Sequence, residues 1–91
     1  MSSVVNQQTN DNISVISMAG APVNALSKAI RVGVIAAMEA ALADNNIQAI
    51  VITSELPLFS AGADISEFSG GDLSPMLPEV LSVIENSSKP V

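Results

Sequence analysis

The sequence predicts an α/β fold, and three observations support this prediction. Ile47 to Thr53 (IQAIVIT) is an almost continuous run of β-branched residues, which is typical of a parallel strand covered on both faces. A predicted helix, capped by Ser27 and ending near Ala43, comes directly before it. Two short strands, Ser3 to Thr9 and Ile13 to Met18, precede that helix. This order predicts an opening hairpin followed by a strand-helix-strand unit.

The opening hairpin is predicted to turn at Asn10-Asp11-Asn12, because Asn and Asp accept the backbone conformations of tight turns. We expect Ile13, Val15 and Ile16 of its second strand to face the core.

The long helix is predicted to begin at the Ser27 cap and to end at Asp44-Asn45-Asn46. Its large apolar face consists of Ile30, Val34, Met38 and Ala41. A second face consists of the small residues Gly33, Ala36, Ala40 and Ala43. A helix that is apolar on two sides is normally buried on more than one side, but alanine is also simply a good helix former. Both interpretations of the small-residue face remain open.

The second half of the chain continues with a loop, Ser54 to Ala63, and a short helical turn in which Asp64 and Glu67 have capping-box spacing. A last helix is predicted to begin in the Ser74 to Pro78 region and to end at Glu85.

The final residue, Val91, is predicted to begin another strand, because Pro90 prevents the helix from continuing. A parallel sheet needs neighbouring strands and covering helices. We therefore expect residues 1–91 to be one segment of a larger domain, incomplete at its C-terminal end.

The composition excludes several kinds of chemistry. The 91 residues contain no His, Cys, Trp or Tyr, which excludes imidazole bases, thiolate nucleophiles, disulfides and Cys/His zinc sites, and no metal site is predicted. Three basic and nine acidic residues give a net charge of −6, so nucleic acid is not an expected partner. No apolar run is long enough to span a membrane. Catalysis by this chain would have to use backbone groups, carboxylates, hydroxyls or its three cations.

The segment Phe59 to Ile65 (FSAGADI) is the most informative part of the sequence. It places four small residues between a predicted strand and a helix start, where backbone N–H groups can approach a ligand oxygen. Two such donors can stabilise a developing oxyanion without any reactive side chain. The alternative interpretation is a tight strand-to-helix turn whose small residues serve packing alone.

Four segments together resemble the enoyl-CoA hydratase/isomerase (crotonase) superfamily. They are PVNALS at Pro22 to Ser27, IQAIVIT, FSAGADI, and SSKPV at Ser87 to Val91, in the order of the family. The resemblance covers nearly the whole chain from Ile13 onward, and it is greatest to the amino-terminal domain of multifunctional β-oxidation enzymes. It implies that residues 1–91 are the amino-terminal part of a crotonase-like ββα spiral fold.

The resemblance also implies specific sites. The backbone N–H of Ala61 would form one half of an oxyanion hole for the thioester carbonyl of an acyl-CoA substrate. The residues implied to contact coenzyme A are Ala63, Asp64 and Ile65 beside its adenine end and Ala25 and Leu26 along its other wall. Lys28 and Arg31 lie in the first helical turn and either contact a phosphate or form a solvated pair, and Arg31 can alternatively pair with a carboxylate.

The implied activity is hydration of 2-enoyl-CoA, or isomerisation of 3-enoyl-CoA, through a stabilised thioester enolate. The alternative is a non-catalytic acyl-CoA-binding or assembly module. The resemblance implies that the catalytic glutamates and the second oxyanion donor lie in segments that follow Val91. Capping explains Asp64 and Glu67, so neither is expected to be the general base.

The expected binding partners follow from the same resemblance. No cofactor is expected to bind this segment, coenzyme A enters as part of the substrate, and NAD would belong to a separate dehydrogenase domain. The remainder of the domain is the expected partner, within a homo-oligomer or multifunctional complex. The expected location is the cytoplasm, with peroxisomal and mitochondrial locations left open.

Overall fold

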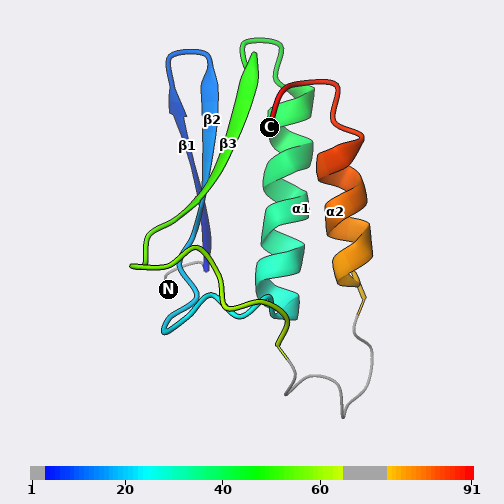
Figure 1. Ribbon diagram of the computed structural model, residues 1–91. Helices are drawn as coiled ribbons and strands as arrows, with labels where there is room; N and C mark the ends of the chain where they lie inside the picture. Colours follow the sequence, from blue (N-terminus) through cyan, green and yellow to red (C-terminus); the bar gives the residue numbers. More distant parts are fainter. Residues whose placement is uncertain (1–3, 65–73) are drawn as a thin grey trace.

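A computed structural model describes residues 4–64 and 74–91 of the chain. The elements are, in order, β1 (Val5–Asn10), β2 (Ile13–Met18), α1 (Lys28–Ala43), β3 (Ala49–Ser54) and α2 (Leu77–Glu85), as Figure 1 shows. The predicted α/β class is confirmed, as are the opening hairpin, the long helix after Ser27 and the last helix. Strands β1 and β3 each begin two residues later than predicted. The helical turn predicted after Asp64 lies outside the described residues.

The three strands form one sheet in the order β1-β2-β3. Strands β1 and β2 are antiparallel, and β2 and β3 are parallel, in a register that pairs Ile13 with Ala49 and Met18 with Ser54. The hairpin between β1 and β2 turns through Asp11, whose φ of 54° lies in the left-handed region that Asp tolerates better than most residues. Helix α1 connects the two parallel strands, so the predicted strand-helix-strand unit is confirmed.

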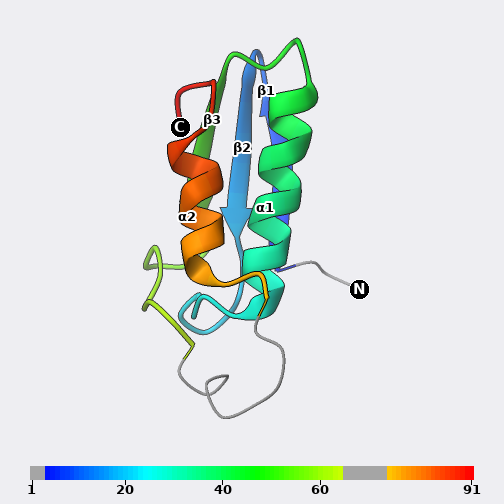
Figure 2. The same cartoon turned by 90° about the vertical axis from the view of Figure 1, so that its right-hand side faces the viewer.

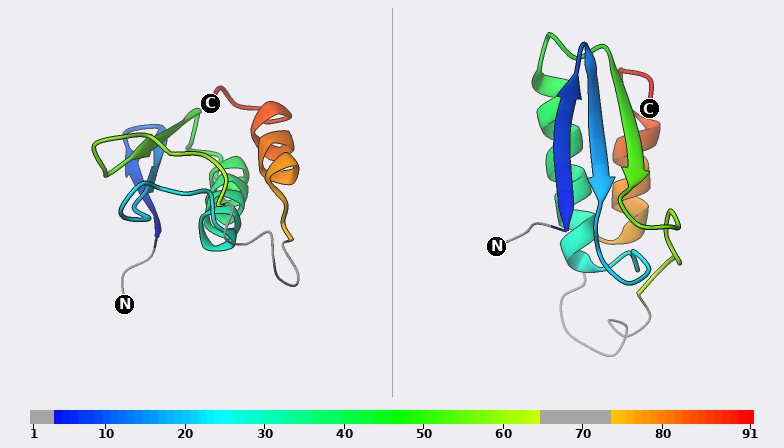
Figure 3. Two further views of the ribbon diagram at one scale, coloured as in Figure 1. Left: turned by 60° about the horizontal axis from the view of Figure 1, so that its bottom comes forward. Right: turned by 90° about the vertical axis from the view of Figure 1, so that its left-hand side faces the viewer.

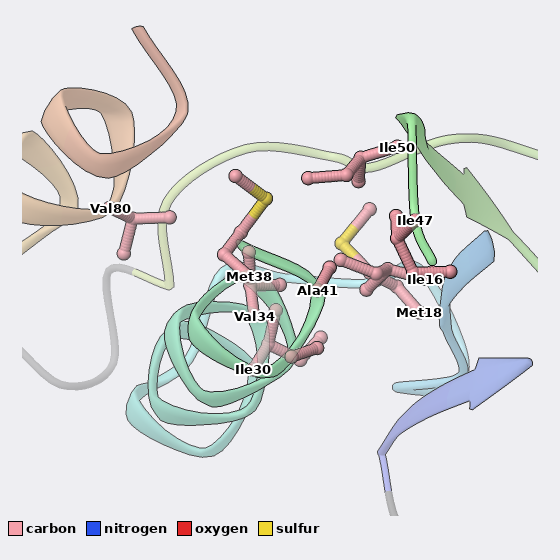
Figure 4. Packing of buried hydrophobic residues seen from close by; sticks show 10 residues of the cluster. Ile16, Met18, Ile30, Val34, Met38, Ala41, Ile47, Ile50 and Val80 are labelled. Atoms are coloured by element: carbon pink, nitrogen blue, oxygen red, sulfur yellow. The ribbon is translucent and has the colours of Figure 1, made fainter. Parts of the chain in front are cut away.

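Both helices lie on the same face of the sheet. Figure 2 shows them in front of the strands, and the right-hand view of Figure 3 shows the opposite face of the sheet with the helices behind it. The core lies between these two layers and is built mainly from β2, α1 and β3 (Figure 4). Its fully buried centre includes Ile16, Met38 and Ala41, each 0 or 1% exposed. Burial of large apolar side chains at this interface is the main favourable contribution to folding.

Strand β2 presents a different face to the core from the one predicted. Ile16 and Met18 are buried as core residues, and Ser14 lies on the same face at 1% exposed. Ile13 is 39% exposed and Val15 only half-buried, so the prediction was right for Ile16 and wrong for Ile13 and Val15. The sequence ISVISM carries apolar residues in both alternating registers, so periodicity does not select the face.

Ser14, the buried polar residue on this face of β2, is stabilised by a hydrogen bond to its hydroxyl. The side-chain Nε2 of Gln7 on β1 donates to the hydroxyl of Ser14 at 2.8 Å and to the backbone carbonyl of Ala37 on α1 at 2.9 Å. A buried hydroxyl with a hydrogen-bond partner avoids most of the cost of desolvation.

Helix α1 begins and ends where the sequence predicts. The Ser27 hydroxyl accepts from the backbone N–H of Ile30 at 3.4 Å, and the helix ends at Ala43 with Asp44 as its C-cap. Lys89 stabilises the C-terminal end, because its Nζ donates to the carbonyls of Ala41 and Asp44 at 2.7 and 2.8 Å. A cation at this end interacts favourably with the helix dipole.

The small-residue face of α1 has two different environments. A Cβ atom added at Gly33 would lie 2.6 Å from Cγ2 of Val5, so the absence of a side chain there allows β1 to pack closely. Ala36, Ala40 and Ala43 are exposed. Burial of this whole face is therefore not found among the residues that the structure describes.

Helix α2 packs beside α1 through Val80, its buried residue. Leu77 and Ile84 are half-buried, whereas Leu81 is 53% exposed. Beyond the helix, the carbonyl of Pro90 accepts from the backbone N–H of Ile50 at 2.8 Å, so the chain here lies against the edge of β3. Val91 does not lie in a strand of the structure, so the predicted strand is not formed there. Its neighbour Pro90, however, lies where a further strand would pair with β3.

Candidate functional site

The loops that follow β2 and β3 meet at one end of the molecule. The carboxyl ends of these parallel strands lie at the lower end of Figure 1, together with the N-terminal ends of both helices. Ligands of open α/β sheets bind at this end of the strands, where loops rather than helices fill the space. The predicted site residues of both loops are therefore brought to the same part of the fold.

Backbone hydrogen bonds join the two loops directly. The N–H of Leu26 donates to the carbonyl of Gly62 at 2.8 Å, and Leu26 forms a parallel bridge with Ala63. The N–H of Ala61 donates to the carbonyl of Val23 at 2.9 Å. The structure thus brings the loop of Leu26 against the loop of Ala61 and Ala63, although Leu26 is more than thirty positions away from both in the sequence.

The two alanines on either side of Gly62 differ in what their N–H groups do. The N–H of Ala61 is engaged by Val23, a contact that sequence reasoning did not anticipate. In the parallel bridge between Leu26 and Ala63, the N–H of Leu26 bonds to the carbonyl of Gly62, the residue before Ala63. In this pattern the N–H of Ala63 itself points away from Leu26. Gly62 has a φ of +99°, which turns the chain between them.

Asn24 is a residue of this site that sequence reasoning missed. Its side chain is 0% exposed, and its φ of 51° lies in the left-handed region. Its Oδ1 accepts from the N–H of Gly20 at 2.7 Å, and its Nδ2 donates to the hydroxyl of Ser54 at 2.7 Å and the carbonyl of Phe59 at 2.9 Å. One side chain therefore connects its own loop, the end of β3 and the loop that carries FSAGADI.

Ser60 continues this network toward the glycine. Its hydroxyl donates to the backbone carbonyl of Asn24 at 2.7 Å and accepts from the N–H of Gly62 at 3.0 Å. Asn24 lies within the PVNALS segment, and Asn is one of the few non-glycine residues that adopt a left-handed conformation. Its partners are distant in sequence, so only the folded chain reveals them.

The two cations of the first helical turn have different environments. Arg31 is 7% exposed, and its guanidinium donates to the carbonyls of Leu26 and Pro75, both at 2.6 Å. The interpretation of Lys28 and Arg31 as a solvated pair is therefore wrong for Arg31. Lys28 is exposed. It lies at the N-terminal end of α1, where the helix dipole already favours anions.

A shallow hollow of about 190 Å³ borders these loops. It is lined by Ala25 and by the half-buried Asp64, among others. This places two of the predicted coenzyme A contacts at one concave surface. The predicted contact Ile65 and the predicted capping residue Glu67 lie outside the described residues.

An apolar groove of about 260 Å³ lies between the two helices and β3. Ile52, Val80 and Phe59 are among its lining residues, and Phe59 is 58% exposed. The groove thus approaches the FSAGADI segment at Phe59. Its lining is almost entirely hydrocarbon, apart from Arg31.

Metal ligands and membrane spans are the two remaining features of interest in the described residues, 4–64 and 74–91. No group of three or more His, Cys, Asp or Glu residues there is placed to hold a metal ion. Neither helix in this part of the chain has the length and apolar character needed to cross a bilayer.

Solved structures share this fold. An enoyl-CoA hydratase from Mycobacterium marinum matches with a TM-score of 0.86 and 16% identity, over 96% of this chain and 45% of its own. An enoyl-CoA hydratase/isomerase from Pseudoalteromonas atlantica matches with a TM-score of 0.83 and 22% identity, over 96% of this chain and 36% of its own. At these identities the likeness establishes the crotonase fold alone.

Sequence comparisons place the chain more closely. A peroxisomal bifunctional enzyme of Danio rerio is 42% identical over 80 residues, which are 88% of this chain and 11% of that protein. A peroxisomal fatty acid β-oxidation multifunctional protein of Arabidopsis thaliana is 36% identical over 91 residues, 90% of this chain and 12% of that protein. The chain thus spans about a tenth of the length of these relatives. The family model for enoyl-CoA hydratase/isomerase matches residues 8–91, and the chain therefore belongs to the enoyl-CoA hydratase/isomerase family.

Proposed function

We propose that the protein carrying this chain acts on enoyl-CoA thioesters in fatty-acid β-oxidation, with hydration of 2-enoyl-CoA as its first activity and isomerisation of 3-enoyl-CoA as its second. Family membership and the β-oxidation relatives support this proposal. The observation that carries it is the junction of the two loops at the carboxyl ends of the parallel strands β2 and β3, the end at which open α/β sheets commonly bind ligands.

The role of the loop in this proposal is to stabilise negative charge on the thioester oxygen. In hydration, a base takes one proton from water as the water oxygen bonds to C3, and the electrons of the C2–C3 double bond move onto the thioester oxygen to give an enolate. An acid then delivers a proton to C2, and the enolate electrons re-form the thioester carbonyl. A backbone donor close to the resulting enolate oxygen lowers the barrier, by several kcal/mol for a well-placed oxyanion hole. The proton transfers require acid and base groups that we do not assign to the described residues.

Two N–H groups are candidates for this donor. The sequence prediction is Ala61, but its N–H would first have to give up its hydrogen bond to Val23. The N–H of Ala63 points away from its bridge partner, so it can donate to a substrate without breaking that bridge. We therefore favour Ala63 as the donor, with Ala61 as the alternative in which the substrate carbonyl replaces the carbonyl of Val23.

Coenzyme A is proposed to lie across the hollow beside Ala25 and Asp64, with Lys28 near its phosphates. The exposed Lys28 and the N-terminal end of α1 give a positive region in a chain with a net charge of −6. Leu26 remains a proposed wall contact, and Ile65 a proposed contact from the sequence alone.

The test is turnover by the full-length protein with crotonyl-CoA and with a 3-enoyl-CoA. Loss of absorbance at the conjugated thioester band reports hydration, and its appearance from the 3-enoyl substrate reports isomerisation. Turnover of either substrate supports the proposal. Tight binding of both without turnover would instead support a non-catalytic acyl-CoA-binding module.

The cellular setting is proposed from the same relatives. Their names place them in peroxisomes, which favours a peroxisomal location over the cytoplasm expected from sequence. A multifunctional protein or a homo-oligomer remains the proposed assembly, and an NAD-dependent step would belong to residues outside this chain. Immunofluorescence with a peroxisomal marker tests the location.

A further inference from the structure

We propose that Asn24 and Ser60 are positioning residues for the backbone donors of the FSAGADI loop. This inference rests on the proposed function, because it explains the hydrogen bonds of Asn24 and Ser60 by the proposed binding of a thioester at the FSAGADI loop. Neither residue is proposed to touch the reacting atoms. Their role is to hold the loop, with Ala61 bonded to Val23, so that the N–H of Ala63 keeps the direction that a developing oxyanion requires.

The first step of the argument is the burial of Asn24. A side-chain amide that is 0% exposed is costly unless its polar atoms are hydrogen-bonded, and those of Asn24 are. Its Nδ2 donates to Ser54 at the end of β3 and to the carbonyl of Phe59, while its Oδ1 accepts from Gly20. The loop is thereby attached to a rigid sheet rather than only to its own neighbours.

The second step is where these bonds fall along the loop. Phe59 is held through its carbonyl, Ser60 through its hydroxyl and Gly62 through its N–H. These residues lie before and between the two alanines whose N–H groups are the candidate donors. Fixing both sides of Ala61 and the residue before Ala63 restricts the directions in which those N–H groups can point.

The third step is the backbone of Asn24 itself. Its φ of 51° is a conformation that Asn tolerates and that most residues with a Cβ atom avoid. The Val23 carbonyl, which precedes it, accepts from Ala61, and the Asn24 carbonyl accepts from Ser60. The left-handed turn at Asn24 therefore directs two successive carbonyls toward the FSAGADI loop. The backbone and the side chain of Asn24 both hold this loop in place.

The variants separate these contributions. Ser60→Ala removes the hydroxyl that joins Asn24 to Gly62, and Ser60→Thr keeps a hydroxyl. Asn24→Gly keeps the left-handed backbone and removes the side-chain bonds. Ser82→Ala is the matched control, because the Ser82 hydroxyl on α2 accepts from the side chain of Asn86 at 3.1 Å at an exposed position away from the FSAGADI loop.

The first measurement is steady-state kinetics of the full-length protein with crotonyl-CoA. Small displacements of a catalytic donor cost up to about a hundredfold in rate. We expect kcat to fall about 10- to 100-fold in Ser60→Ala and Asn24→Gly, with KM within about threefold. Ser60→Thr is expected to recover most of kcat, and Ser82→Ala to match the unmodified protein.

The second measurement does not depend on turnover. Butyryl-CoA carrying a ¹³C-labelled thioester carbonyl cannot be hydrated, and its C=O stretching frequency falls when donors polarise the bound carbonyl. We expect a large part of that frequency shift to be lost in Ser60→Ala and restored in Ser60→Thr. A residue with a merely structural role would lower the folded fraction but leave the shift in the folded molecules intact.

The outcomes are distinguishable. If both variants keep the carbonyl shift and keep kcat within about twofold, the positioning role is refuted. If activity falls only in proportion to the folded fraction measured by thermal unfolding, the role is refuted as well. If the unmodified protein turns over neither enoyl substrate, the proposed function fails, while the carbonyl shift of the variants still decides the positioning role.

Discussion

Gly62 offers a direct test of how backbone conformation supports the site. Its φ is +99°, which residues with a Cβ atom rarely adopt, and a Cβ placed there would meet no atom of the described residues within 4 Å beyond its two chain neighbours. Within the described part of the chain, the expected effect of Gly62→Ala is therefore conformational. A residue held in such a region costs about 1–3 kcal/mol. This strain is the quantity that the experiment measures.

The strain can be expressed in two ways. If the loop keeps its conformation, the free energy of unfolding falls by about 1–3 kcal/mol. If the loop relaxes to negative φ, stability is retained and the N–H of Ala63 is displaced. The same energy lost from transition-state stabilisation corresponds to about a 5- to 150-fold lower kcat/KM. Gly62→Asn is expected to reduce the free energy of unfolding and kcat/KM less than Gly62→Ala does, because Asn tolerates positive φ better than Ala.

The assay combines urea unfolding with crotonyl-CoA kinetics on the full-length protein. Gly33→Ala is the control, because its added Cβ would lie 2.6 Å from Val5, away from the loop. It tests packing, and we expect it to alter stability while kcat/KM stays within about twofold. The reasoning is refuted if Gly62→Ala changes neither quantity, or if Gly33→Ala reduces kcat/KM as much as Gly62→Ala does.

Three further substitutions test the core, the helix end and the substrate contact. The Met38 side chain is 0% exposed, and Met38→Ala is expected to lower the free energy of unfolding by about 2–5 kcal/mol in urea titrations. The control Val32→Ala, at a side chain that is 46% exposed, is expected to lower it by about 0.5 kcal/mol or less. Equal losses would contradict the assigned core. Lys89→Met removes the two hydrogen bonds that Nζ donates to the carbonyls of Ala41 and Asp44 at the end of α1, and we expect it to lower the free energy of unfolding by about 1–2 kcal/mol in the same titration. Lys89→Arg is expected to be milder, and an unchanged midpoint for Lys89→Met would argue against the cap. Lys28→Gln is expected to raise KM for crotonyl-CoA about two- to fivefold and to leave KM for crotonyl-pantetheine, which lacks phosphates, unchanged. The same increase for both substrates would rule out a phosphate contact.

Local patterns were sufficient for most of the secondary structure. The Ser27 cap and the Asp44 terminus of α1 were predicted correctly, because capping and helix breaking depend on residues within one or two turns. The parallel strand β3 was recognised from its β-branched run, although it begins two residues later than predicted. Strand ends depend on pairing with a neighbour, which composition does not specify.

The site was predictable only in outline. Recognition of FSAGADI and PVNALS indicated the two loops that meet, and the structure places Leu26 against Gly62 and Ala63. The prediction that Ala61 is the oxyanion donor remains untested, and its hydrogen bond to Val23 could not be foreseen from the sequence. Which N–H is engaged depends on the register between two loops, and a shift of one residue exchanges the bonded and the outward-pointing groups.

The amino-acid sequence by itself determined the order of elements, the capped helix α1 and the family resemblance, because each is encoded in short stretches of neighbouring residues. Only the tertiary structure decided which face of β2 is buried, why Arg31 is not solvated and what Asn24 connects. The physical reason is the same for all three. Burial and hydrogen bonding of these groups depend on partners that lie far away in the sequence, and those partners come within reach only when the sheet, the helices and the two loops pack together.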